Sequence, residues 1–360
     1  MSETTTAAPK SPAPEALTTA LTTGCALVRR SGTSPWEMPG EDRGRFLNGL
    51  VTCPVQDLEA GTGTYGFITS AKGKVLADLV VLAAGDRFFL ELPESAAETA
   101  REHVLKYRIA DRVEMEPLGD QVIWTVAGPA AAALLAGLVD GVPGDEWQHR
   151  RTSLAGVPVR LARRGVAPVP AWDLWLPEDG GEAVRAALVE AGAVEAGAVD
   201  TGAVDPGMVD AGSAGHAAWE RLRVAAGVPR FGLDFGPDNL PQETGLEAAA
   251  VSYEKGCYLG QEVVARVHYR GGVNKGLVGL RLGAAGSAKQ GEVEPGVAPG
   301  ADVSYDGRSA GRLGTVAAGS GGEPAIALAI LHSRAAEPGT VVEVEGGGEA
   351  TVVSLPFEAA

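Results

Sequence analysis

The segment 255–262, K-G-C-Y-L-G-Q-E, contains the residues of this chain that are best suited to chemistry. Cys257 lies between Gly256 and Gly260, next to Lys255, and just before residues 260–267, whose valine spacing predicts an amphipathic helix. A helix N-terminus and a nearby cation both favour a thiolate over a thiol, so Cys257 is reactive if solvent reaches it. The alternative is a structural cysteine that packs at the start of a helix.

Charge and cysteine totals limit what the protein can be. The chain has 360 residues, which predicts two or three domains, and its net charge of −16 argues against general nucleic-acid binding without excluding a local basic pocket. The cysteines at 25, 53 and 257 are far apart and form no CxxC pair, so no metal site is expected. They indicate a reducing compartment, and we therefore expect a cytoplasmic protein. No apolar run approaches the roughly 20 residues that span a membrane.

Hydrophobic spacing predicts the elements that would position these residues. Residues 65–69 and 75–82, joined by a short turn, predict a β-hairpin, and 172–176 alternates as a half-buried strand does. Other strands are expected at 87–92, 120–127 and 152–164, and helices at 42–50, 95–105, 129–139, 182–191 and 216–226.

Composition divides the chain further. Residues 1–15 predict a disordered tail, and the acidic, glycine-rich repeat at about 192–215 predicts a flexible surface insertion. An α+β pattern covers 16–270. Residues 271–360 show short strands separated by glycine turns, which predict a small β-barrel. Its strands are expected at 277–282, 301–305, 311–317, 325–331, 340–344 and 350–355.

The segment 255–262 resembles the K-G-C-Y/F-x-G-Q-E motif of YgfZ-type folate-binding proteins and matches each fixed position. These proteins are relatives of the glycine-cleavage T-protein, an aminomethyltransferase. They form the branch of the T-protein superfamily that acts in iron–sulfur cluster assembly or repair. The resemblance covers roughly residues 20–355. Further similar segments are 47–52, 72–78, 223–232, 240–243, 314–316 and 325–329.

The resemblance implies a T-protein-like α+β fold, with two α+β domains around a central folate channel and a C-terminal β-barrel. It implies tetrahydrofolate, or another reduced folate, as the cofactor. It also implies iron–sulfur client or assembly proteins as partners, whereas neither nucleic acid nor a membrane is expected. Within the motif, Cys257 would be the functional thiol that handles a sulfur, iron or one-carbon species. Lys255 would lower its pKa or hold an anion, and Gln261 lies four residues later on the same helical face.

A folate site needs a carboxylate for the N–H donors of the pterin, flat apolar walls, and a cation for the glutamate tail. Asp173 occupies the place of the family's pterin-binding acid, although that acid is a glutamate with one more methylene. Trp172 or Trp175 would form a wall, Arg223 would be the cation with Arg221 as its substitute, and Asp78 could face the channel. The alternatives are an exposed aspartate at 173, solvated arginines on a helix, and a polar strand face at 78.

Three functions remain open from the sequence, including whether the protein is an enzyme. The first is a tetrahydrofolate-binding accessory protein for iron–sulfur clusters, without classical turnover. The second is a folate-dependent one-carbon transferase, which is weakened because no aspartate follows Leu92 where T-proteins carry one. The third is an interaction module with a vestigial folate site. No P-loop or HExxH motif occurs in the sequence.

Overall fold

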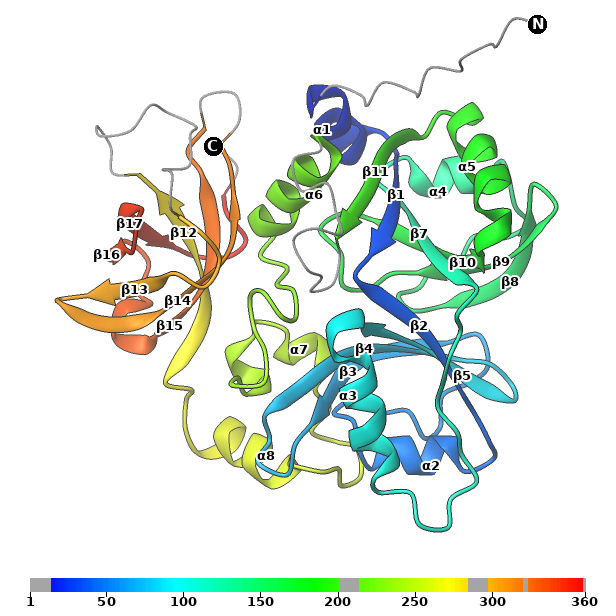
Figure 1. The fold of residues 1–360 in the computed structure, drawn as a ribbon, viewed down its shortest axis with the longest axis horizontal. Helices are drawn as coiled ribbons and strands as arrows, with labels where there is room; N and C mark the ends of the chain where they lie inside the picture. The colour runs from blue at the N-terminus through cyan, green and yellow to red at the C-terminus, as the bar shows by residue number, and fades with distance from the viewer. Residues whose placement is uncertain (1–13, 201–213, 284–296, 320–322, 359–360) are drawn as a thin grey trace, which may run out of the picture.

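A computed structural model describes residues 14–200, 214–283, 297–319 and 323–358. Two sheets with their helices and a C-terminal barrel form three units arranged around a common centre (Figure 1). The α+β class with a C-terminal barrel is therefore confirmed. The predicted tail lies almost entirely outside the described residues, and helix α1 begins at Pro14.

The first unit is a five-stranded sheet in the order β3-β4-β5-β2-β6. Its centre is the predicted hairpin, in which β3 pairs with β4 and Phe67 faces Asp78. Apolar residues of β3, β4 and β5 form one large core with α3, because their alternation places them on the same faces. The elements are β2 Thr33–Pro39, α2 Arg43–Asn48, β3 Gly63–Thr69, β4 Val75–Ala83, β5 Arg87–Pro93, α3 Glu94–Leu105 and β6 Glu116–Pro117.

The second unit is a six-stranded sheet in the order β11-β1-β7-β10-β9-β8. Helices α4 and α5 cover one face, and the first unit packs on the other through Ala162 and Trp175. The expectation of a half-buried strand at 172–176 is wrong, because β10 is central and covered on both faces. The elements are α1 Pro14–Thr23, β1 Ala26–Ser31, β7 Gln121–Ala127, α4 Ala131–Ala136, β8 His149–Leu154, β9 Val157–Arg163, β10 Ala171–Pro177, α5 Gly181–Glu190 and β11 Val194–Asp200.

The repeat at 192–215 differs from the prediction in its first part. Residues 194–200 form β11, which pairs in parallel with β1 at the edge of the second sheet. Small residues suit this position because α6 approaches the strand closely: a side chain at Gly215 would overlap the carbonyl oxygen of Ala196. Residues 201–213 lie outside the described part of the chain.

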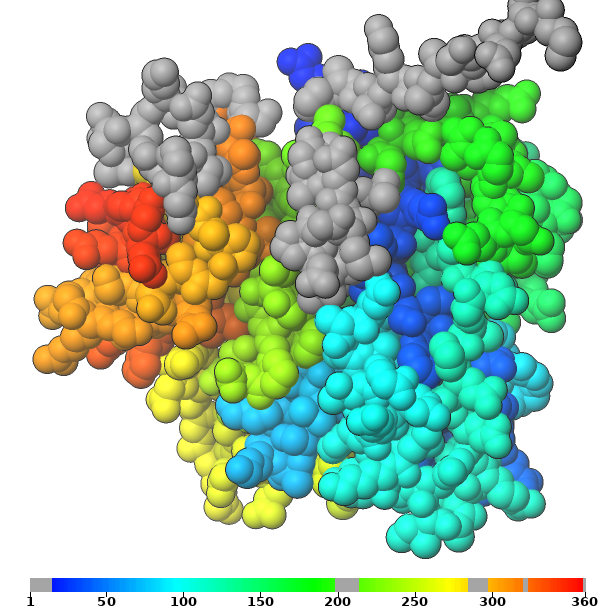
Figure 2. Space-filling view, in the orientation of Figure 1, coloured from blue at the N-terminus to red at the C-terminus, as the bar shows by residue number. Residues whose placement is uncertain are grey.

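The third unit is a closed barrel in the order β12-β15-β14-β13-β16-β17, which confirms the predicted strands. A segment of short helices links it to the sheets, and Figure 2 shows the light-green part of this segment filling the space between the barrel and the first unit. The linking helices are α6 Ala214–Ala225, α7 Glu247–Ala250 and α8 Gln261–Arg270. The barrel strands are β12 Lys275–Leu282, β13 Asp302–Tyr305, β14 Arg308–Ala317, β15 Ile326–His332, β16 Val341–Val344 and β17 Gly348–Val353. Short 3-10 helices lie at Glu178–Gly180, Pro241–Glu243 and Ser333–Ala335.

None of the helices in the described ranges is both long enough and apolar enough to cross a bilayer. The cytoplasmic location stays a prediction from cysteine usage. The exact domain boundaries also stay predictions. The first barrel strand begins at Lys275, close to the expected boundary at 271.

Candidate functional site

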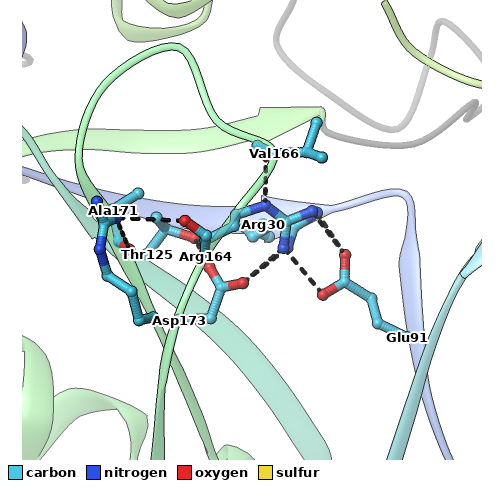
Figure 3. A network of polar contacts seen from close by, with 8 residues as sticks. Arg30, Glu91, Thr125, Arg164, Val166, Ala171 and Asp173 are labelled. Carbon is cyan, nitrogen blue, oxygen red and sulfur yellow. Dashed lines mark hydrogen bonds and ion pairs between the residues drawn. The ribbon is translucent and has the colours of Figure 1, made fainter. Parts of the chain in front are cut away.

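A buried network of charged side chains joins the two sheets (Figure 3). Asp173 of β10 accepts hydrogen bonds from Thr125 of β7 at 2.6 Å, from Arg30 of β1 at 3.3 Å and from Arg164 at 2.5 Å. Glu91 of β5, in the other sheet, pairs with Arg30 at 2.6 Å and with Arg164 at 3.1 Å. Two arginines thus balance two carboxylates, and they do so across the interface between the units.

The network keeps Glu91 ionised despite its burial. Burial alone would raise the pKa of Glu91, but Arg164 and Arg30 outweigh it and hold that pKa at about 2. A carboxylate offers about four acceptor positions, and the neighbours of Asp173 already use three of them. Asp173 is therefore buried, as a pterin-binding acid would be, but most of its acceptor positions are occupied by donors of the protein itself.

Asp78 lies nearby in a different electrostatic setting. The hydroxyl of Tyr65 donates to its carboxylate at 2.8 Å across the β3–β4 hairpin, and no ion pair to Asp78 is found among the described residues. Burial raises the pKa of Asp78 to about 6, and Glu91 adds to this, while the Tyr65 hydrogen bond works against it. Asp78 thus keeps acceptor positions for a ligand and changes charge close to neutral pH.

Two small cavities lie beside Asp78, with volumes of about 40 and 70 Å³. Both are lined by Arg30, Tyr65, Asp78, Arg164 and Arg230, and the larger also touches residues from the α6 segment. They lie where the two sheets meet the link to the barrel. Their size suits the edge of a ring and not a whole folate, because pockets for drug-sized ligands have about 300–1,000 Å³.

Arg223 also reaches the larger cavity but has no hydrogen-bonding capacity left for a ligand. An arginine has five N–H donors. Here they go to the carboxylate of Glu220, the backbone oxygen of Val228, Asp234 at 2.7 Å and Thr315 at 2.5 Å. Arg223 therefore ties α6 to the following loop and to the barrel.

Arg221 is likewise engaged in structure, with Glu323 and the Ala318 carbonyl oxygen. The cations that do line both cavities are Arg30, Arg164 and Arg230, which the sequence interpretation missed. Only Arg230 lay in a segment singled out by resemblance, 223–232.

The tryptophans of β10 are not walls of these cavities. Trp172 points to the opposite face of the sheet, where its ring packs in the core with α4 and α5 and its Nε1–H donates to the Pro143 oxygen at 2.8 Å. Trp175 shares the Asp173 face but packs edge-on against Phe89, farther along the strand. Because side chains alternate along a strand, Trp172 and Asp173 cannot face the same cavity.

The motif loop places Cys257 at the surface, so the buried alternative is wrong for this residue. Lys255 does not accompany it outward. Its Nζ donates to the backbone oxygens of Asn48 at 2.7 Å, Val51 at 2.6 Å and Cys53 at 3.0 Å. Burial lowers the pKa of Lys255 to about 8, so the amine still carries its proton at neutral pH and holds the motif against the first unit.

The rest of the motif packs against the turn of the β3–β4 hairpin. Thr69 donates its hydroxyl to the Leu259 oxygen at 2.6 Å, and a side chain at Gly260, where φ is +85°, would overlap the backbone of Ser70 and Gly73. Helix α8 begins only at Gln261, whose side-chain oxygen accepts from the backbone N–H of Tyr258 at 3.4 Å. Cys257 therefore precedes the helix by a full turn, and no motif residue lines the two cavities beside Asp78.

Comparisons with known proteins agree with this architecture. The family model described as GCVT N-terminal domain matches residues 11–255. A protein of Arabidopsis thaliana that is provisionally named a chloroplastic transferase is 24% identical over 338 residues, which cover 93% of this chain and 71% of that protein. The tRNA-modifying protein YgfZ of Vibrio vulnificus is 27% identical over 239 residues, or 66% of this chain and 64% of its own length.

Among solved structures, the glycine cleavage system aminomethyltransferase T from Bartonella henselae superposes with a TM-score of 0.75. The match covers 96% of this chain and 89% of that protein at 20% sequence identity. This likeness establishes the fold, and the T-protein-like architecture expected from the motif is confirmed.

Proposed function

Since this chain belongs to the family of the GCVT N-terminal domain, we propose that it is a YgfZ-type protein that binds tetrahydrofolate or another reduced folate. Its role would be to support the assembly or repair of iron–sulfur clusters in client enzymes, with Cys257 as the functional thiol. The observation that carries the folate assignment is the half-buried Asp78 carboxyl, which lines both small cavities where the two sheets meet the link to the barrel.

The residues around Asp78 fit the pterin part of a folate. A pterin ring presents neighbouring N–H donors on one edge, and a carboxylate with open acceptor positions matches them. The phenol of Tyr65 fixes the carboxylate of Asp78 in place. Asp173 would act one step away, because it orients Arg164, which lines the cavity. The pterin-binding role thus moves from Asp173 to Asp78, which was the weaker candidate in the sequence.

Binding of a whole folate requires the cavity to widen. The present volumes of about 40 and 70 Å³ hold only part of the ligand, so the segment 228–230, which lines the larger cavity, would move on binding. Arg30 and Arg164 are already paired with Glu91 and Asp173, so either arginine would exchange one of these contacts for a carboxylate of the glutamate tail.

Calorimetric titration with tetrahydrofolate tests the assignment. We expect wild type to bind and Asp78→Asn to lose about 10- to 100-fold in affinity, because a charge-assisted hydrogen bond contributes about 1.5–3 kcal/mol. Asp302→Asn, an exposed aspartate of the barrel, is the matched control and should bind as wild type does. Equal affinity of Asp78→Asn and wild type would place the folate elsewhere.

The thiol part of the proposal needs a separate test. In cells that lack the protein, wild type should restore the activity of enzymes that depend on [4Fe–4S] clusters, and Cys257→Ser should not. Cys25→Ser is the control, because Cys25 is buried in the second unit and should restore activity. Full restoration by Cys257→Ser would exclude a role for this thiol.

A folate-dependent one-carbon transferase is the second candidate. One observation favours it: burial raises the pKa of Asp78 to about 6, which suits a residue that exchanges protons near neutral pH. Transfer of a one-carbon unit from an aminomethyl donor, which is already at the oxidation level of formaldehyde, to tetrahydrofolate with release of ammonia would support this candidate over the accessory role if it is lost in Asp78→Asn.

The name of the bacterial relatives links them to tRNA modification. For this chain we propose that any such link runs through a client enzyme, since the net charge of −16 disfavours direct contact with RNA. A mobility-shift assay with tRNA should therefore show no complex, and a stable complex would overturn this part of the proposal.

A further inference from the structure

A much larger cavity, of about 730 Å³, lies at the other end of the interface between the two sheets. It opens between the β4–β5 turn of the first unit and strands β8, β9 and β10 of the second. It shares no lining residue with the two cavities beside Asp78. Trp175 and Phe89 form part of its floor, so the core of the interface separates it from the proposed folate site.

The lining of this cavity is basic although the chain as a whole is acidic. Arg87, Arg150, Arg151 and Arg160 line it, against a single carboxylate, Asp86. Arg87 is already balanced by Glu37 at 2.7 Å and Asp86 at 2.6 Å. Among the described residues, the other three arginines form no ion pair. Three positive charges thus converge on one cavity without a protein counter-ion.

Arg160 is held rigidly in this lining. Its guanidinium carbon lies 3.9 Å from the centre of the Phe89 ring, and its Nη1 donates to Nδ1 of His149 at 3.0 Å. His149 is buried and bonds the Ala83 oxygen through Nε2 at 3.0 Å. Burial lowers the pKa of His149 to about 4, and Arg160 adds to this, so the imidazole is neutral and accepts from Arg160.

The remaining donors of Arg160 have no partner within the described part of the chain. An arginine carries five N–H donors, and only the one to His149 is used. A planar guanidinium that is stacked on one face and fixed at one corner is pre-organised for a bidentate contact with a carboxylate or phosphate group. The neighbouring arginines at 150 and 151 add charge from β8.

We propose that this cavity is a second binding site, for a small polyanion that carries two or more phosphate or carboxylate groups. The volume falls within the range of about 300–1,000 Å³ that is typical of small-molecule sites. The three unbalanced arginines supply the affinity, and Arg160 fixes the orientation. This site is independent of the proposed folate site and does not rest on it.

Calorimetric titration at low salt tests the proposal, with pyrophosphate as the phosphate probe and citrate as the carboxylate probe. Wild type should bind at least one of them with a Kd below about 1 mM. Arg160→Gln should weaken binding at least about tenfold, because it removes the positive charge and the paired N–H donors of the guanidinium group. The ratio of the two wild-type affinities identifies which anionic group the site prefers.

Three controls make the result decisive. Arg308→Gln removes an exposed arginine of the barrel and should bind as wild type does. Asp78→Asn should leave binding of both probes unchanged, which separates this site from the folate site. Arg151→Gln removes an exposed cation of the same cavity and replaces Arg160→Gln if that variant does not fold.

The proposal is overturned if neither probe binds, or if Arg308→Gln weakens binding as much as Arg160→Gln does. The second outcome would mean that the probes respond to overall charge. Binding of a long RNA with no binding of either small probe would likewise exclude a small-molecule site.

Discussion

Replacement of Asp78 by asparagine should stabilise the folded protein while it damages the proposed folate site. Asp78 is half-buried near Glu91, and the partial burial of its carboxyl raises its pKa from 3.8 to about 6. An acid with a raised pKa in the folded state favours folding below its unfolded pKa, and this contribution is lost as the pH rises through the folded pKa. At neutral pH the ionised Asp78 therefore opposes folding.

The shift sets the size of the effect. About two pKa units at 1.36 kcal/mol each correspond to about 3 kcal/mol of stability that wild type lacks near pH 8. Near pH 5 the native carboxyl is mostly protonated, and the same shift leaves a penalty of only about 1.6 kcal/mol. Asp78→Asn keeps an oxygen acceptor for the Tyr65 hydroxyl and removes the charge, so it should avoid the penalty at both values.

Urea unfolding, followed by tryptophan fluorescence, measures this directly. The free energy of unfolding of Asp78→Asn should exceed that of wild type by about 3 kcal/mol near pH 8, and the gap should narrow by about 1.4 kcal/mol near pH 5. A variant less stable than wild type near pH 8 would refute the reasoning. A gap that does not change with pH would show that the carboxyl does not titrate as inferred.

Asp173→Asn is the matched comparison, because the chemical change is identical and the expected sign is opposite. Asp173 accepts from Arg30 and Arg164, both largely buried. Removal of one partner from a buried ion pair typically costs about 3–5 kcal/mol, since the opposite charge is left uncompensated. Asp173→Asn should therefore unfold at a lower urea concentration than wild type near pH 8. Equal effects of the two substitutions would contradict the different environments described for them.

Three further predictions concern the motif loop and the pH dependence of binding. Gly260→Ala should destabilise the protein by roughly 1–3 kcal/mol in thermal or urea unfolding, because φ is +85° and the added carbon would overlap the Ser70 carbonyl oxygen; unchanged stability would contradict the close packing. Of the three cysteines, only Cys257 is exposed, and burial raises the pKa of the other two to about 11, so a thiol reagent should label one site rapidly near pH 8 and none in Cys257→Ala. Tetrahydrofolate affinity should fall as the pH drops below about 6, because Asp78 then gains a proton and loses its acceptor character; calorimetry that shows the same affinity at about pH 5 and about pH 7 would argue against Asp78 as the ring partner.

Much of the fold was predictable because it depends on short-range patterns. Alternating apolar residues identified the β3–β4 hairpin, and glycine-separated strands identified the barrel. The strand β11 was missed because its residues are small and acidic, and its pairing with β1 joins segments far apart in the sequence. The burial of β10 was underestimated because covering of both faces depends on what packs there, which no local pattern reports.

The site was predictable in part. The motif singled out Cys257, and the structure shows that this thiol is exposed. The expected effect of Lys255 on the thiol is not supported, because the lysine amine turns inward to backbone oxygens. Arg223 was chosen as a free cation although its donors are all used within the protein. Arg30 and Arg164 were not found, because their contacts with Glu91 follow from how two sheets stack.

The sequence by itself determined the family resemblance, the α+β class with its barrel, and the presence of one distinctive cysteine motif. The resemblance ranked Asp173 above Asp78, but the local pattern does not distinguish them, since each is an aspartate between apolar residues on a strand. Only the tertiary structure decided that Asp173 forms ion pairs with two arginines. Asp78 instead accepts a hydrogen bond from a tyrosine and is repelled by the charge of Glu91. The charge and the free acceptor positions of a buried carboxyl depend on its neighbours in space, and those neighbours come from other strands.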